Sequence, residues 1–82
     1  MMKTELQYRK AIGCALLAIR NSMAEDGIKP SQEDVAEEAG ISLRYYGSIE
    51  RGKVMPTIYT LAKIAGALRL SLPKLCELIE NY

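Results

Sequence analysis

Apolar residues recur along most of the chain at spacings of three and four, which is the repeat of a helix with one buried face. The first such segment runs from about Glu5 to Met23. Its apolar stripe contains Ile12, Leu16, Ile19 and Met23, with Tyr8 and Ala15 beside it. Cys14 and Leu17 project away from the stripe, toward solvent or a partner. The pattern ends at residues 24–30, AEDGIKP, where a glycine and a proline break the helix.

Two shorter helices are predicted next, at residues 32–39 and 43–51, with almost no chain between them. Each of these helices is preceded by a serine suited to N-capping and followed by a glycine suited to ending it. In the first helix, an aspartate three residues after the serine completes a capping box. These capping residues are Ser31, Asp34, Gly40, Ser42 and Gly52. Helices joined by so short a turn must cross steeply. This helix-turn-helix arrangement leaves the outer face of the second helix free to enter a DNA major groove.

The second of these helices has two different faces. One face carries Tyr45, Tyr46 and Ile49, with Glu50 at its edge, and the other carries Leu43, Arg44, Gly47, Ser48 and Arg51. Arginine and serine can hydrogen-bond base edges and phosphates, and leucine can contact a thymine methyl. Taken alone, these residues also fit a solvated helix face that happens to carry two arginines. The two-helix pattern around them favours DNA.

Two further helices are predicted in the last third of the chain. Thr57 caps one of them, whose buried stripe contains Ile58, Leu61, Ile64, Ala65 and Leu68. Gly66 within it is expected to allow close helix approach. Ser71 caps the last helix, and Pro73 fits its first turn.

The last helix has a wider apolar face than so small a core needs. This face contains Leu72, Leu75, Cys76, Ile79 and Tyr82. The surplus predicts a dimer interface formed by Leu75, Leu78, Ile79 and Tyr82. A helix that simply docks on its own domain is an equally open interpretation.

Length and charge narrow the class of protein. The 82 residues suffice for one domain, residues 1–82, with a small core. The net charge of +1 is low for a DNA-binding protein, so its distribution matters more than its sum. Residues 25–38 carry six acids and one lysine, whereas residues 39–76 carry six basic residues and one acid. The positive charge therefore coincides with the proposed reading helix and the chain that follows it.

The composition argues against catalysis and metal binding. The chain has no histidine, the commonest general base, and no glycine-rich phosphate loop. Cys14 and Cys76 lack the spacing of a zinc site and would leave half of its ligands unfilled. We expect them to be reduced and to act as small apolar side chains. No enzyme activity, cofactor, metal or small-molecule ligand is expected.

The location is predicted from two absences. No apolar run is long enough to span a bilayer, and the opening residues MMKTELQYRK lack the features of a secretory signal. We therefore expect the cytoplasm of a bacterium, or of a host that carries a phage or plasmid.

This ordered series of residues resembles the Cro/C1-type, or xenobiotic-response-element-like, helix-turn-helix repressors. The likeness covers about residues 12–76, through Ile12-Gly13, Arg20, Gln32 to Ala36, Ala39-Gly40-Ile41-Ser42, Ile49-Glu50-Arg51-Gly52-Lys53, Pro56, and Leu61 to Leu68. The resemblance implies an all-α, five-helix DNA-binding domain. It also implies a homodimer that binds a two-fold operator in double-stranded DNA.

The resemblance further implies roles for single residues. Gln32 should bond a phosphate and brace the reading helix. Leu43, Arg44 and Ser48 match the base-reading positions of the family. Tyr45, Arg51 and Lys53 match positions on or near the phosphate backbone. Together with Gln32 and Ser42, these residues form the predicted DNA-binding set. Arg20 and Glu50 match positions that form a partly buried ion pair. The chain departs from the family at two positions. Gly47 stands where the family often has a polar residue, and Leu43 stands where it often has a small or polar one.

The resulting hypothesis is a sequence-specific transcriptional regulator, a repressor or controller protein, that blocks or recruits polymerase. The alternative is a protein-interaction module, such as an antitoxin or adaptor, whose helix-turn-helix contacts protein. The low net charge and the acidic residues 25–38 favour that alternative. Salt dependence separates the two, because DNA binding that neutralises phosphates weakens steeply with added salt. The sequence does not specify the operator, the regulated genes or the sign of regulation.

Overall fold

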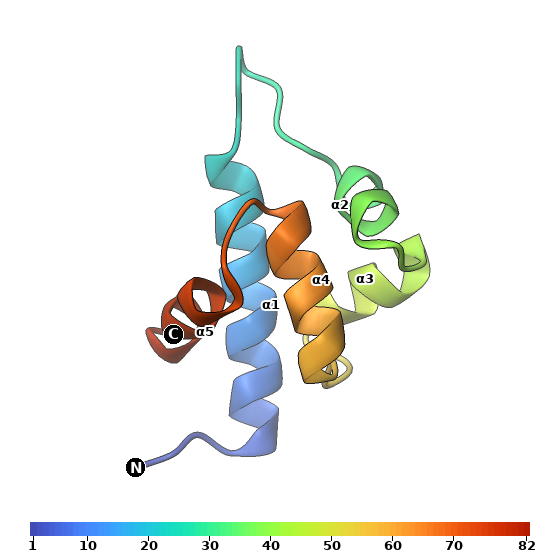
Figure 1. Cartoon of the computed structure of the whole chain (residues 1–82). Helices are drawn as coiled ribbons and strands as arrows, with labels where there is room; N and C mark the ends of the chain where they lie inside the picture. Colours follow the sequence, from blue (N-terminus) through green and yellow to red (C-terminus); the bar gives the residue numbers. More distant parts are fainter.

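The computed structural model describes residues 1–82 and consists of five α-helices without a β-sheet. They are α1 (Glu5–Ser22), α2 (Gln32–Ala39), α3 (Leu43–Glu50), α4 (Ile58–Ala67) and α5 (Leu72–Glu80). Helix α1 is the longest and runs through the middle of the molecule (Figure 1). Both α3 and α5 pack against α1, and α2 and α4 pack against each other. The prediction of an all-α, five-helix fold is confirmed. No helix is both long and apolar enough to cross a membrane.

Each helix begins at a serine or threonine whose side-chain oxygen accepts a backbone N–H from the first turn. These N-caps are Thr4, Ser31, Ser42, Thr57 and Ser71. The capping box predicted at the start of α2 is present. The N–H of Asp34 donates to Ser31 Oγ over 3.0 Å, and the N–H of Ser31 donates to the Asp34 carboxylate over 2.9 Å. Gly40 and Gly52 follow α2 and α3 in the left-handed conformation, as predicted, each with a φ of 73°.

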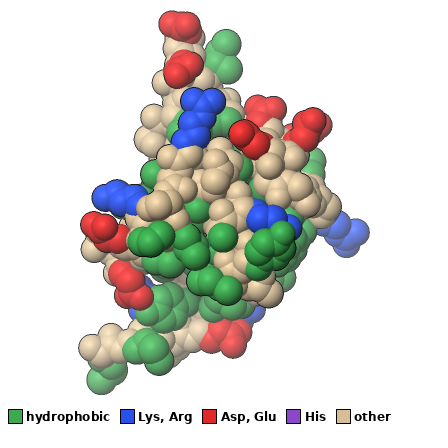
Figure 2. Space-filling model, in the orientation of Figure 1, with side chains coloured by type: hydrophobic (Ala, Val, Ile, Leu, Met, Phe, Trp, Pro, Cys, Tyr) green, Lys and Arg blue, Asp and Glu red, His purple; other side chains and the backbone are tan.

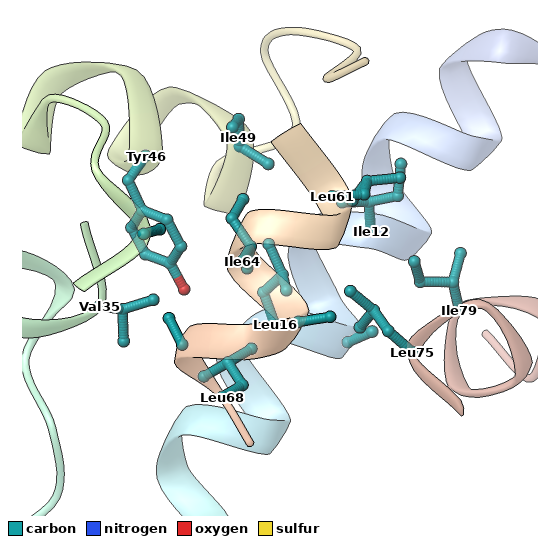
Figure 3. Close-up of a cluster of buried hydrophobic side chains, with 14 of the residues drawn as sticks. Ile12, Leu16, Val35, Tyr46, Ile49, Leu61, Ile64, Leu68, Leu75 and Ile79 are labelled. Carbon is teal, nitrogen blue, oxygen red and sulfur yellow. The ribbon is translucent and has the colours of Figure 1, made fainter. Parts of the chain in front are cut away.

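Sixteen apolar side chains are buried together between the helices. The largest of those that solvent does not reach are Tyr46, Leu16, Ile49, Ile64 and Leu75 (Figure 3). They come from α1, α3, α4 and α5. Helices α2 to α5 have ten residues or fewer, which is too short for an isolated helix to be stable in water. Shared burial of these side chains therefore stabilises the helices as well as their arrangement.

Two predictions for α4 are wrong. Ile58 is 64% exposed instead of buried. It stands in the first turn, ahead of the first buried positions, Thr60 and Leu61, and no other element covers it. Gly66 is exposed as well, and a Cβ at this position would meet nothing within 4 Å, so it does not serve a close helix approach. The rest of the predicted stripe, Leu61, Ile64, Ala65 and Leu68, is buried.

Half of the predicted dimer interface on α5 is also wrong. Leu75 and Ile79 are 0% and 4% exposed and belong to the protein's own core. They are covered because α5 packs against both α1 and α4. Of the four predicted interface residues, only Leu78, half-buried, and Tyr82, 53% exposed, reach the surface. Most of this face therefore docks on the domain itself.

Residues 24–30 contain a tight turn, Glu25 to Ile28, that projects beyond the helices (Figure 1). Glu25 and Ile28 exchange two backbone hydrogen bonds of 2.8 Å. Asp26 and Gly27 between them have φ values of 52° and 79°. Positive φ at both central residues is the signature of a type I′ turn, which reverses the chain within two residues. Helix α1 ends one residue before its predicted end, which leaves the chain free to enter this turn.

The first and last helices are fastened together near the ends of the chain. The ammonium group of Lys3 donates to the backbone oxygen of Glu80 over 2.9 Å. The Tyr8 hydroxyl donates to the Glu80 carboxylate over 2.5 Å. This hydrogen bond is the main cause that lowers the pKa of Glu80. The last turn of α5 is thereby held beside the start of α1.

Acidic side chains gather over the projecting turn and α2, at the top and upper right of the molecule (Figure 2). The exposed acids of this region are Glu25, Asp26, Glu33, Asp34, Glu37 and Glu38. The acidic stretch of the sequence is therefore also an acidic end of the surface.

Candidate functional site

Helices α2 and α3 are joined by a three-residue turn that fixes their relative orientation. The N–H of Gly40 bonds to the backbone oxygens of Ala36 and Glu37, and the N–H of Ile41 also bonds to Ala36, over 3.0 Å. Ser42 then starts α3, and its hydroxyl oxygen accepts the N–H of Tyr45 over 3.0 Å. Because that oxygen already caps the helix, its acceptor capacity is partly used.

The outer face of α3 is open to solvent at its N-terminal half. Leu43 is 46% exposed, and Arg44 is exposed with no carboxylate within ion-pair distance. The hydroxyl of Ser48 donates to the backbone oxygen of Arg44 over 3.0 Å, which leaves its lone pairs free to accept. Tyr45 is half-buried, and its neighbour Tyr46 is fully buried. The exposed side chains can therefore approach a ligand while the helix is anchored from behind.

Gly47 was expected on the open face of α3, and this prediction is wrong because the residue is buried. A Cβ at this position would be 2.9 Å from Nη1 of Arg51 and 3.5 Å from Oε1 of Gln32. The missing side chain lets Arg51, one turn later, and Gln32, from α2, fold over the helix backbone. Gly47 thus leaves room beside the backbone of α3 for two predicted DNA-binding side chains from different helices.

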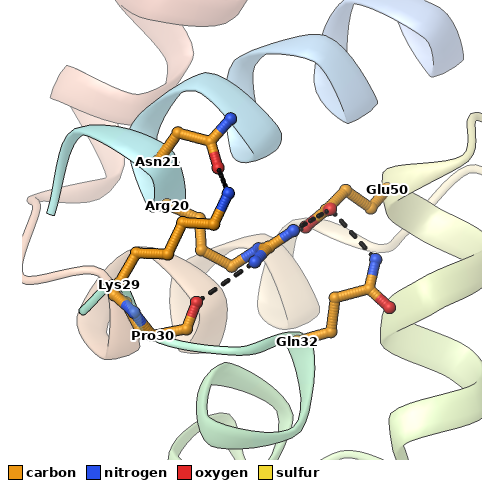
Figure 4. Close-up of polar contacts among 6 residues, drawn as sticks. All are labelled: Arg20, Asn21, Lys29, Pro30, Gln32 and Glu50. Atoms are coloured by element: carbon orange, nitrogen blue, oxygen red, sulfur yellow. Dashed lines mark hydrogen bonds and ion pairs between the residues drawn. The ribbon is translucent and has the colours of Figure 1, made fainter. Parts of the chain in front are cut away.

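A polar cluster lies behind α3 and joins it to α1 and α2 (Figure 4). Arg20 donates from Nη2 to Glu50 Oε1 over 2.7 Å and from Nε to Oε2 over 3.1 Å, a two-pronged ion pair. Nη1 of Arg20 also donates to the backbone oxygen of Pro30 over 3.1 Å. Gln32 Nε2 donates to the same Glu50 carboxylate over 3.0 Å. The side chains of Arg20 and Glu50 are only 10% and 4% exposed.

These contacts keep the buried pair ionised. Burial opposes the charged form of Glu50, but hydrogen bonds from Arg20 and Gln32 outweigh it and hold the pKa of Glu50 below its usual value. The bond to Glu50 raises the pKa of Arg20 in turn. Since both partners stay charged, the carboxylate that ends α3 is held by α1 and α2 together.

The hydroxyl of Tyr46 is buried close to the Arg20–Glu50 pair, but no hydrogen bond of ordinary geometry reaches it. Burial raises the pKa of this hydroxyl far above its usual value, so it stays protonated. Most buried polar groups in proteins are paired, so this one is an exception inside the core of the site. Sequence patterns mark Tyr46 as a core residue but give no sign of the missing partner.

Helix α1 also touches the backbone at the end of α3. A Cβ at Gly13 would lie 2.3 Å from the backbone oxygen of Glu50, so only glycine allows this approach. Nη1 of Arg9 donates to the backbone oxygen of Lys53 over 3.1 Å. Sequence reasoning missed both contacts, because nothing in the local sequence distinguishes these residues from a helical glycine or arginine that makes no such contact.

The predicted DNA-binding residues therefore fall into two groups. Exposed Leu43 and Arg44 and half-buried Ser48 lie on the outer face of α3, while Gln32 and Arg51 both lie beside Gly47. Lys53 is exposed in the loop that follows α3. No group of three or more metal-ligating side chains is present, and Cys14 and Cys76 are free thiols.

Fold and site define the class of protein: a small all-α domain with a helix-turn-helix whose second helix is anchored behind and open in front. A family model described as helix-turn-helix matches residues 31–75, more than half of the chain. The chain belongs to this family, of the Cro/C1 type, whose members are DNA-binding transcriptional regulators.

Curated relatives and a solved structure agree with this assignment. The chain is 45% identical over 49 residues to the cryptic phage CTXphi transcriptional repressor RstR of Vibrio cholerae, covering 60% of this chain and 44% of RstR. It is 36% identical over 66 residues to the HTH-type transcriptional regulator y4dJ of Sinorhizobium fredii, covering 80% and 79%. The crystal structure of the clp gene regulator ClgR from Corynebacterium glutamicum superposes with a TM-score of 0.76 at 26% identity, covering 90% of this chain and 73% of ClgR. The chain thus spans less than half of the length of RstR.

Proposed function

We propose that this regulator reads a specific sequence in double-stranded DNA by inserting α3 into the major groove. The observation that carries the proposal is the open face of α3, where Leu43, Arg44 and Ser48 are presented by a helix locked from behind. Arg44 supplies donors for a guanine edge, Ser48 a hydroxyl, and Leu43 a methyl contact with thymine. A rigid helix matters here because base contacts require fixed side-chain positions.

Phosphate contacts would come from the edges of the same surface. Arg51 and Lys53 carry unpaired positive charges after α3, and Gln32 stands at the start of α2. Helix N-termini favour bound phosphates, because backbone N–H groups point outward there. Tyr45 and Ser42 lie between these groups along the chain and complete the proposed DNA-binding set.

We also propose that two copies bind a two-fold operator, with reading helices about 34 Å apart, one turn of DNA. Apolar side chains that stay exposed support the proposal because a second copy would cover them: Ile58 and Tyr59 on α4, and Tyr82 just after α5. Such a regulator would act in the compartment that holds the DNA, which in a bacterium is the cytoplasm. The family consists of regulators, and no enzymatic role is proposed.

The acidic surface over residues 25–38 favours a second candidate function, a module that binds a basic protein partner through α2. Its acids would repel DNA phosphates, so that face would have to turn away from a bound duplex. The two candidates differ in their macromolecular partner and therefore in their response to salt.

Selection of bound duplexes from a random pool tests the proposed function. The expected result is an enriched motif with two half-sites in inverted orientation, bound less tightly as salt increases. A pool that shows no enrichment, together with no salt-dependent binding, would overturn the proposal and favour the protein-binding candidate.

A further inference from the structure

The loop after α3 rests on α1, and Arg9 is the side chain that fastens it there. A Cβ at Gly52 would be 3.5 Å from both the backbone oxygen of Arg9 and the Cα of Lys10. Nη1 of Arg9 donates to the backbone oxygen of Lys53 over 3.1 Å. Nε of Arg9 lies 3.6 Å from the Glu5 carboxylate, one turn earlier on α1. The guanidinium group is therefore held between α1 and the loop.

The backbone at this point is arranged so that the oxygen of Lys53 faces α1. The N–H of Lys53 donates to the backbone oxygen of Ser48 over 2.9 Å, and the N–H of Gly52 donates to the backbone oxygen of Ile49 over 3.0 Å. These bonds close the last turn of α3. A guanidinium beside the C-terminal end of a helix also interacts favourably with the negative end of the helix dipole. Arg9 thus stabilises the geometry with which the chain leaves the reading helix.

We infer that Arg9 is a positioning residue that directs Lys53 toward the DNA backbone. The inference rests on the proposed function, in which Lys53 contacts a phosphate. The side chain of Lys53 is exposed and has no ion-pair partner, so its direction is set by the backbone that carries it. That backbone is fixed by the hydrogen bond from Arg9 on one side and by Gly52 on the other.

Lys10 offers a matched control. It is the next residue of α1, carries the same charge and is exposed, but it makes no hydrogen bond or ion pair through its side chain. Arg9→Gln and Lys10→Gln therefore remove one positive charge from almost the same place. Only Arg9→Gln removes the contact with the loop.

The test measures the affinity of the full chain for a duplex that the wild-type protein selects from a random pool, over a series of salt concentrations. One phosphate contact contributes about 0.9 to the slope of log K against log salt. Because the proposed dimer carries each residue twice, Arg9→Gln and Lys53→Gln should each reduce the magnitude of that slope by about 1.8, and the double variant should show no larger reduction than either. Lys10→Gln should leave the slope unchanged.

Three results would overturn the inference while leaving the proposed function intact. Additive slope changes in the double variant would mean that Arg9 binds a phosphate independently of Lys53. Equal effects of Arg9→Gln and Lys10→Gln would mean that only the total charge matters. A lower melting temperature of Arg9→Gln with an unchanged slope would mean that the contact is purely structural. A wild-type protein that binds no duplex would overturn the proposed function itself.

Discussion

Gly13 of α1 lies directly against the backbone oxygen of Glu50 at the end of α3. A Cβ at Gly13 would be 2.3 Å from that oxygen, well inside van der Waals contact. Because the obstacle is backbone and not a flexible side chain, the two helices would have to separate. The absence of one methyl group therefore sets the distance between the scaffold helix and the proposed reading helix.

Gly13→Ala should destabilise the protein by about 1–3 kcal/mol, the usual cost of overpacking a core. Gly66→Ala is the matched control, since both glycines are in helices but a Cβ at Gly66 meets nothing within 4 Å. That change should stabilise the fold by about 0.5–1 kcal/mol, because alanine favours the helix. Chemical denaturation measures both. Equal effects of the two changes would contradict the close approach at Gly13.

The buried pair of Arg20 and Glu50 should behave as one unit. Arg20→Met or Glu50→Gln alone leaves a buried charge without its partner and should cost on the order of 3–5 kcal/mol. The double variant should cost much less than the sum of the two, because neither charge remains. Thermal unfolding of the three variants measures the coupling. Additive losses below about 1 kcal/mol each would show that the pair contributes no more than an exposed one.

Acid should destabilise the wild-type protein through Glu50. The pKa of Glu50 is lower in the folded protein than its ordinary value of 4.5, so the folded state binds the proton less readily than the unfolded chain. The ionised carboxylate contributes its full stability when the pH is above the ordinary pKa. This contribution is lost as the pH falls through the lower pKa that Glu50 has in the folded protein. Unfolding curves recorded from pH 6 downward should therefore fall more steeply for the wild type than for the Arg20→Met, Glu50→Gln double variant. Asp34 and Glu80, whose pKa values are also lowered, would supply the dependence that remains.

Removal of the Tyr46 hydroxyl should be harmless or favourable. The oxygen is buried close to Glu50 without a hydrogen bond of ordinary geometry, so its desolvation is at best partly compensated. Tyr46→Phe keeps the ring in the core, and the free energy of unfolding should stay the same or rise by up to about 1 kcal/mol. Denaturant unfolding tests this directly. A loss of more than about 1 kcal/mol would show that the hydroxyl is hydrogen-bonded in solution.

Arg44 and Lys53 should differ in what they contribute to DNA binding. Arg44→Ala should cost about 1–3 kcal/mol on the selected duplex and relax the preference at one base pair in each half-site. Lys53→Ala should weaken binding to all sequences alike, because a phosphate contact carries no base information. A repeat of the selection with each variant distinguishes the two. Losses that are independent of sequence for both changes would remove Arg44 from the base-reading set.

The features that the sequence predicts well are those decided within a few residues. Capping serines, the glycine stops and the three-residue spacing of Ser31 and Asp34 act locally, and each is found where the pattern places it. The helix-turn-helix follows from them, because two capped helices with so short a turn have few ways to pack. The five-helix fold is predictable for the same reason.

The features that the sequence misplaces depend on which helix covers which face. Ile58 has the phase of the buried stripe, yet nothing lies over the first turn of α4. Gly13 and Gly66 are both helical glycines, and only the packing shows that the first touches a neighbouring helix. Leu75 belongs to an apolar face whose partner, core or second copy, periodicity does not determine. In each case the answer lies in contacts between residues that are distant in sequence.

The contact of Lys3 and Tyr8 with Glu80 has a consequence for the order of the helices along the chain. Since the start of α1 and the end of α5 are held side by side, a short flexible linker could join residues 1 and 82. New ends could then be opened between Asp26 and Gly27, at an exposed turn that no helix covers. Such a circularly permuted protein would begin with α2 and α3 and end with α1. The scaffold and the reading helix could thus exchange their order in the gene while keeping every contact described between them.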